Sequence, residues 1–160
     1  MIITLIQLAK SNRALDYDSL WYGLRPELVL IGDNSFFDNL HLNMFVHYYS
    51  KLYEFILIPL SNLGDYSFIL NATTFLLVLI FISIYTFLRS LGMSDKFSIL
   101  TTVLIASIPA LSNMGSTAKT DIIFVLLFMI NFLYLWDWLK NKQKHSLILA
   151  LIVSLLCLHT

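Results

Sequence analysis

The chain has 160 residues, of which 58% are hydrophobic and only 12% are charged, and its net charge is zero. An ordinary soluble domain carries about 25% charged residues, so this composition excludes a conventional water-soluble globule. The balanced charge also gives no electrostatic reason to expect a nucleic-acid partner. The sequence instead predicts an all-α, polytopic membrane protein.

The first apolar segment, residues 1–9, is too short to cross a bilayer. It also lacks the basic residues that precede the apolar part of a signal peptide. We interpret it as the end of a truncated first transmembrane helix.

The segment that follows, residues 10–67, is too long for a simple connection and is rich in aromatic residues with charges scattered between them. Stretches of this kind lie along a membrane interface. Asp18 has the position of an N-cap for a short helix, and Pro26 suits the first turn of a second stretch. A longer helix is expected over residues 42–60, with an apolar stripe that includes Phe55 and Ile56.

Four further apolar segments are expected to be membrane helices: residues 68–88, 97–114, 122–139 and 146–160. About 20 helical residues cover the roughly 30 Å hydrocarbon core, so the first three are predicted to cross it, whereas the fourth is incomplete. Pro109 could kink the second helix. In the third, Asn131 is expected to bond a neighbouring helix, and Trp136 and Trp138 are expected at the interface.

Lysine and arginine in short loops favour the cytoplasmic side. The basic loops 89–96 and 140–145 are therefore predicted inside. The segment 10–67 carries four basic and seven acidic residues, and the connection 115–121 carries one of each, so both are predicted outside. The expected location is the plasma membrane, which the protein is expected to cross several times.

Short motifs follow one another in the outer segment: Asp-Tyr-Asp-Ser-Leu-Trp-Tyr at 16–22, Leu-Arg-Pro-Glu at 24–27, and Tyr-Ser-Lys-Leu-Tyr-Glu at 49–54 ahead of Leu-Gly-Asp. This order resembles the first outer loop of GT-C glycosyltransferases, the superfamily of protein O-mannosyltransferases and aminoarabinose transferases. The residues at 116–121 resemble the second outer loop of those enzymes, and the terminal Leu-His-Thr resembles the end of their next span. Gly23 departs from the pattern, because related bacterial loops often carry histidine there.

The resemblance implies an enzyme that moves a sugar from a polyprenyl-phosphate carrier to an acceptor at the outer membrane face. Such a reaction needs a base for the acceptor hydroxyl and cations for the departing phosphate. We expect Asp18 to be the base, with Asp16 as the alternative. A purely structural role for Asp18, as a helix cap, is the competing interpretation.

The residues expected to bind substrate are Arg25, Lys51, Glu54, Lys119 and Asp121. The three cations could hold the carrier phosphate, or each could simply extend its charge from the interface into water. Glu54 lies in a strongly apolar stretch, where an ionised group needs a partner. Lys51, three residues earlier, is a natural partner without any catalytic meaning.

No metal or other cofactor is expected. His41 and His47 do not have the i, i+4 spacing that places two ligands on one helix face. The single cysteine, Cys157, allows no intramolecular disulfide and is interpreted as a small hydrophobic residue. The expected partners are the polyprenyl-phosphate-linked sugar and membrane lipid, with the acceptor left open.

Two other classes of protein remain open at this point. A transporter or lipid flippase would also have many spans, but it would place ionisable residues at the middle of the membrane, where these segments carry none. A non-catalytic assembly subunit is the third class. In each case we expect the chain to be the N-terminal part of a longer polytopic protein.

Overall fold

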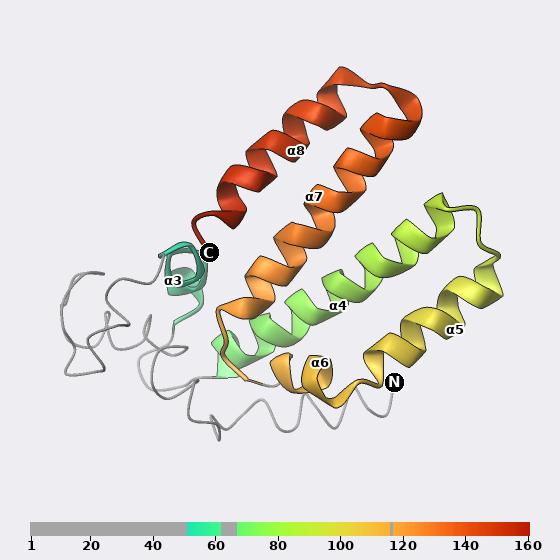
Figure 1. Ribbon diagram of the computed structural model, residues 1–160. Coiled ribbons are helices and arrows are strands. Elements are labelled where there is room, and N and C mark those ends of the chain that lie inside the picture. The colour runs from blue at the N-terminus through green and yellow to red at the C-terminus, as the bar shows by residue number, and fades with distance from the viewer. Residues whose placement is uncertain (1–50, 62–66, 116) are drawn as a thin grey trace.

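The computed structural model describes residues 51–61, 67–115 and 117–160, and every regular element in that part of the chain is helical (Figure 1). The elements are α3 (Leu52–Leu57), the 3-10 helix η3 (Ile58–Leu60), α4 (Ser67–Ser90), α5 (Asp95–Ala106), α6 (Pro109–Met114), α7 (Asp121–Asn141) and α8 (Lys144–Cys157). The all-α class is therefore confirmed for the described residues. The helices expected at 1–9 and around Asp18 and Pro26 lie outside them.

The four longer helices stand side by side in the order α8, α7, α4, α5 (Figure 1). Helix α7 packs on α8 and on α4, and α4 also packs on α5. One end of this row holds α3 and the starts of α4 and α7, and we call it the α3 end. The opposite end holds the α4–α5 and α7–α8 turns, and we call it the turn end.

Helices α4 and α7 agree with the expected spans at 68–88 and 122–139. Phe68–Ser90 within α4 and Asp121–Asn141 in α7 are both long and apolar enough to cross a membrane, with mean hydropathies of 2.3 and 2.0. Of the most apolar part of each helix, only 39% in α4 and 17% in α7 is buried inside the protein. The core helix of a soluble protein would be mostly buried, so these helices suit a surrounding that is itself apolar.

The expected single helix over residues 97–114 is corrected by the structure, which divides it into α5 and α6. Ile108 separates them with an extended backbone (ψ 120°), and Pro109 is the first residue of α6. Proline disfavours the helical conformation in the residue before it, so the helix ends rather than kinks. At about 1.5 Å per residue, the 12 residues of α5 span only about 18 Å, less than the membrane core.

Helix α8 has 14 residues and, as expected for the last apolar segment, is shorter than a transmembrane span. Its partner is α7. The Asn131 side-chain amide of α7 donates a hydrogen bond of 2.8 Å to Ser154 Oγ of α8. This confirms that Asn131 bonds a neighbouring helix.

The buried core runs along α4 and α7 at the α3 end, and it also includes two residues of α3, Tyr53 and Leu57. In the described part of the expected helix over 42–60, which holds α3 and η3, the apolar stripe is not the face that the protein buries. Phe55 and Ile56 are 68% and 43% exposed, whereas Tyr53 and Leu57 are fully covered. A helix of six residues is too short for periodicity to say which side meets a neighbour.

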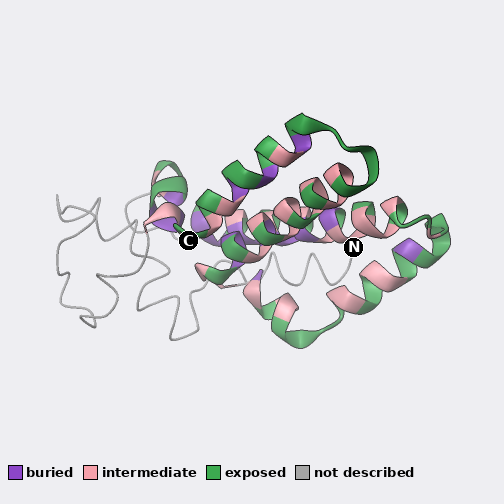
Figure 2. Ribbon diagram, turned by 45° about the horizontal axis from the view of Figure 1, so that its top comes forward, coloured by how far each residue is buried: buried purple, intermediate pink, exposed green. Residues whose placement is uncertain are grey.

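Exposed residues lie along the outward faces of the row (Figure 2), and many of them are large and apolar. Phe75 and Phe128, on the two central helices, are 61% and 55% exposed, and Phe97 and Leu104 on α5 are exposed to a similar extent. Exposed apolar surface on this scale marks a protein or lipid contact.

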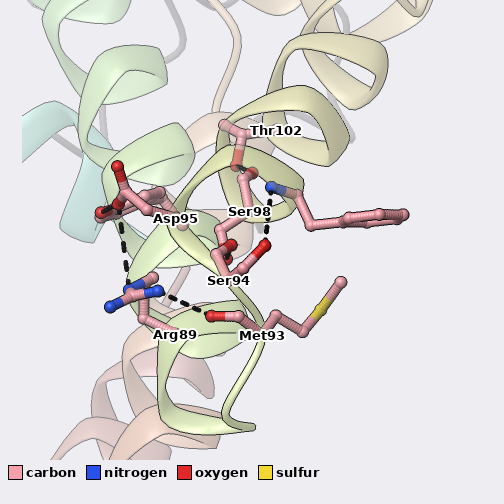
Figure 3. Close-up of polar contacts among 8 residues, drawn as sticks. Arg89, Met93, Ser94, Asp95, Ser98 and Thr102 are labelled. Atoms are coloured by element: carbon pink, nitrogen blue, oxygen red, sulfur yellow. Dashed lines mark hydrogen bonds and ion pairs between the residues drawn. The ribbon is translucent and has the colours of Figure 1, made fainter.

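The α4–α5 turn is held by short-range polar contacts (Figure 3). The Arg89 guanidinium donates to the Met93 carbonyl at 2.7 Å and lies 4.0 Å from the Asp95 carboxylate. Gly92 adopts a left-handed conformation (φ 85°) that glycine accepts without strain, and Ser94 caps α5 by accepting from the Phe97 N–H. The turn therefore brings α5 back antiparallel to α4.

Candidate functional site

The sequence-predicted site divides into two groups. Asp16, Asp18 and Arg25 lie outside the described residues. Glu54 lies in α3, and Lys51 directly precedes that helix. Asp121 is the first residue of α7, and Lys119 lies in the connection just before it. All of the described site residues are therefore at the α3 end (Figure 1).

Lys51 and Glu54 form an ion pair at one turn of helix spacing. The Lys51 ammonium donates to Glu54 Oε1 at 3.4 Å, and the side chains are only 15% and 5% exposed. The expected pairing of these residues is confirmed. A buried pair of this kind is costly to break, because the remaining charge would stay out of water.

Two chain segments far apart in sequence contribute to one buried cluster at the α3 end. Tyr53 and Leu57 of α3 belong to the same buried cluster as Ala118, in the connection before α7, and Ile122, in its first turn. Helix α3 also contacts the last residues of the chain, where the Leu52 N–H donates to the His159 carbonyl at 3.3 Å. Glu54 therefore lies on a helix that shares a buried cluster with Ala118 of the 117–121 connection.

The two remaining site residues differ in their surroundings. Lys119 is partly buried, whereas Asp121 is exposed in the first turn of α7. A carboxylate in that position interacts favourably with the positive end of the helix dipole, typically by about 0.3–1 kcal/mol. Asp121 can therefore stabilise α7 whether or not it contacts a substrate.

The α3 end is completed by a close approach between α4 and the end of α6. The Gly115 carbonyl accepts hydrogen bonds from Thr74 Oγ1 at 2.6 Å and from Thr73 Oγ1 at 3.4 Å. Both threonines are buried, and a Cβ on Gly115 would lie 3.0 Å from Leu77 Cβ. Glycine is needed here for space, and the contact fixes where the 117–121 connection begins.

Sequence reasoning missed a second polar site, at the turn end. A cavity of about 400 Å³ lies between the end of α4 and the α7–α8 hairpin, and we call it the turn-end pocket. Its polar lining includes Ser90, Tyr134, Asp137, Lys140 and His145. Each is an ordinary interfacial residue when taken alone, so only the packing of α7 against α8 could reveal the pocket.

The Asp137 carboxylate in this pocket is bound on both oxygens. Oδ1 accepts from the Asn141 amide at 2.6 Å, and Oδ2 accepts from Ser146 Oγ. Asp137 therefore ties the end of α7 to the start of α8.

Within residues 51–61, 67–115 and 117–160, no three His, Cys, Asp or Glu side chains are grouped to hold a metal ion. His41 and His47 lie outside those ranges. Cys157 is a partly buried free thiol in the last turn of α8.

Comparisons with protein-family models, with curated proteins and with solved structures found no match to this chain.

Proposed function

We propose that this chain is part of a membrane glycosyltransferase of the GT-C kind, which moves a sugar from a polyprenyl-phosphate carrier to an acceptor outside the plasma membrane. The observation that carries the proposal is the convergence at the α3 end. The segment that ends in the motif Tyr-Ser-Lys-Leu-Tyr-Glu packs on the same core as residues 117–121, and both resemble outer loops of that superfamily.

Membrane placement is supported by the two long apolar helices and by their surface. Helices α4 and α7 leave most of their apolar length outside the protein interior. Water would make such exposure unfavourable, at about 25 cal/mol per Å² of apolar surface, whereas lipid would not.

The proposed orientation is supported by the distribution of basic residues between the two ends. The turns predicted to face the cytoplasm meet at the turn end, where the Lys140 ammonium donates to the Ser90 carbonyl at 3.2 Å. The described parts of the segments predicted to face outward, residues 51–61 and 117–121, both contribute to the buried cluster at the α3 end. A single orientation is therefore consistent with the positive-inside rule for the described parts of these segments.

In the proposed reaction, the Asp18 carboxylate takes the proton of the acceptor hydroxyl while that oxygen bonds to the anomeric carbon of the sugar. The bond between this carbon and the carrier phosphate breaks, and the lipid phosphate leaves with the electron pair. Cations near the phosphate stabilise its developing charge. Arg25, Lys51 and Lys119 are the candidate cations, and the Lys51 ammonium also binds Glu54.

A transporter or lipid flippase is the alternative. Transporters bind substrate through ionisable groups near the middle of the membrane. In the described helices, residues 68–84 of α4 and 122–136 of α7 carry no Asp, Glu, Lys, Arg or His. No feature of the described residues favours transport over transfer.

The proposal is tested in the full-length protein with Asp18→Asn, which keeps the size and capping capacity of the side chain but removes the base. Sugar transfer from the polyprenyl-phosphate donor should fall by roughly 10²-fold or more, in line with general-base contributions, while expression and stability persist. Asp16→Asn is the matched control and should cost less.

An inactive Asp16→Asn beside an active Asp18→Asn would move the base to Asp16. Full activity in both variants would contradict the assignment of the base. Substrate uptake into vesicles by a protein that transfers no sugar would contradict the enzyme class itself.

A further inference from the structure

We propose that the turn-end pocket binds the phosphate group of an acidic phospholipid in the inner leaflet. This inference rests on the membrane placement in the proposed function, but not on sugar transfer. It concerns the opposite end of the molecule from the proposed reaction.

The pocket has the polarity of a lipid molecule. Leu133 and Leu149 line its apolar part, and Lys140 and His145 line its polar part. Trp136 also lines it and packs edge to face with Phe87 of α4, with ring centroids 5.9 Å apart. Tryptophan rings favour the headgroup level of a membrane, so the polar part of the pocket lies at the depth of lipid phosphates.

The Lys140 ammonium in the pocket has more donor hydrogens than its one contact with the Ser90 carbonyl uses. The Lys140 side chain is exposed, and one of its three ammonium hydrogens serves the Ser90 carbonyl. The Asp137 carboxylate, the acidic group of the lining, already accepts from Asn141 and Ser146. The Lys140 ammonium therefore keeps donor hydrogens for an incoming phosphate, whereas both oxygens of the Asp137 carboxylate, which stays negatively charged, already accept hydrogen bonds.

The surroundings favour an anion at longer range as well. Residues 89–96 and 137–145 together carry five Lys or Arg and two Asp, a net charge of +3. Helix α8 begins beside the pocket, and its N-cap residue, Gln143, makes no side-chain capping bond. The Ser146 N–H already donates to the Gln143 carbonyl. The positive end of the α8 dipole, next to Lys140, adds attraction for a phosphate.

The test uses the full chain in lipid nanodiscs, with Trp21→Phe and Trp138→Phe so that Trp136 is the remaining tryptophan. Bromine on the acyl chains of a lipid quenches tryptophan fluorescence on contact. At equal mole fractions, brominated phosphatidylglycerol should quench Trp136 more than brominated phosphatidylcholine. Lys140→Gln should lower this preference by about fivefold, the share of one lysine near an anionic surface.

Lys96→Gln is the matched control, since it removes the same charge at the same end but from α5, outside the pocket. It should leave most of the preference intact, and Lys140→Arg should restore it. An equal loss in Lys96→Gln and Lys140→Gln would overturn the proposal, because it would reveal only diffuse surface charge. Abolition of the preference by about 10 mM inorganic phosphate would also overturn it in favour of a soluble anion.

The two proposals fail in different ways. Equal quenching by both lipids would overturn the phosphate site while leaving membrane placement intact. No quenching by either lipid would overturn the membrane placement on which both proposals depend.

Discussion

In the ion pair of Lys51 and Glu54, the energetic cost of burying one charge depends on the presence of the other. Glu54 is the more deeply enclosed of the two, at 5% against 15% exposure of the side chain. Its carboxylate is short, whereas the long lysine stem can carry its charge toward water. Removing the lysine and removing the glutamate should therefore lower the stability of the protein by different amounts.

We expect Lys51→Met to destabilise the protein by about 3 kcal/mol, because it leaves a buried carboxylate without its cation. Glu54→Gln should cost less, and the double variant should recover much of the loss. Unfolding in detergent, followed by circular dichroism, measures the difference. A Glu54→Gln variant less stable than Lys51→Met would contradict this account of the pair.

Some residue-level features could be predicted from the sequence and others could not. The Lys51–Glu54 pair and the Asn131 bond followed from local spacing and from the cost of a polar group in an apolar helix. The Gly115 contact did not, because nothing in a sequence tells which threonines its carbonyl will meet. Asp16 and Asp18 still rest on motif resemblance.

At the scale of elements, the close approach of α6 to α4 gives a prediction about Gly115. Gly115 has an ordinary helical φ of −81°, so alanine there is penalised by contact alone. Its Cβ would lie within 3.0–3.2 Å of Leu77 Cβ and Cγ. We expect Gly115→Ala to cost about 1–3 kcal/mol, the range for overpacking a filled interior.

Gly92 is the matched control. Its surroundings are open, but its φ of 85° is left-handed. Asparagine tolerates that conformation, so Gly92→Asn should change thermal stability little, whereas Gly115→Asn should be more harmful than Gly115→Ala. Equal effects of asparagine at both positions would contradict a steric role for Gly115.

The elements also show why the sequence predicted two helices well and a third badly. Long runs without charge defined α4 and α7, because length alone decides whether a helix can reach across lipid. Residues 97–114 have a similar composition, but the break depends on the conformation of Ile108 ahead of Pro109. The turn-end pocket depends on how α7 meets α8, which composition does not encode.

At the scale of the whole molecule, the row of helices has two chemically different ends. We expect cysteines introduced as Ser35→Cys and Gln143→Cys, each in a Cys157→Ser background, to label from opposite sides of the membrane. Gln143 is exposed in the α7–α8 turn, so a label has access to it. An impermeant maleimide should react in intact cells with the first variant and only after lysis with the second.

Labelling of both positions in intact cells would contradict the two-sided arrangement and, with it, the placement of Asp18 outside. Reversed labelling would place the basic turns outside, against the positive-inside rule.

The shortness of helix α6 determines how readily this part of the protein opens locally. Six residues form too few internal hydrogen bonds to sustain a helix, so α6 depends on its contacts with α4 and α5. Its amides should exchange with solvent deuterium by local opening long before those in the middle of α7. Because Gly115 joins α6 to the connection ahead of α7, each opening would also release the segment that carries Lys119.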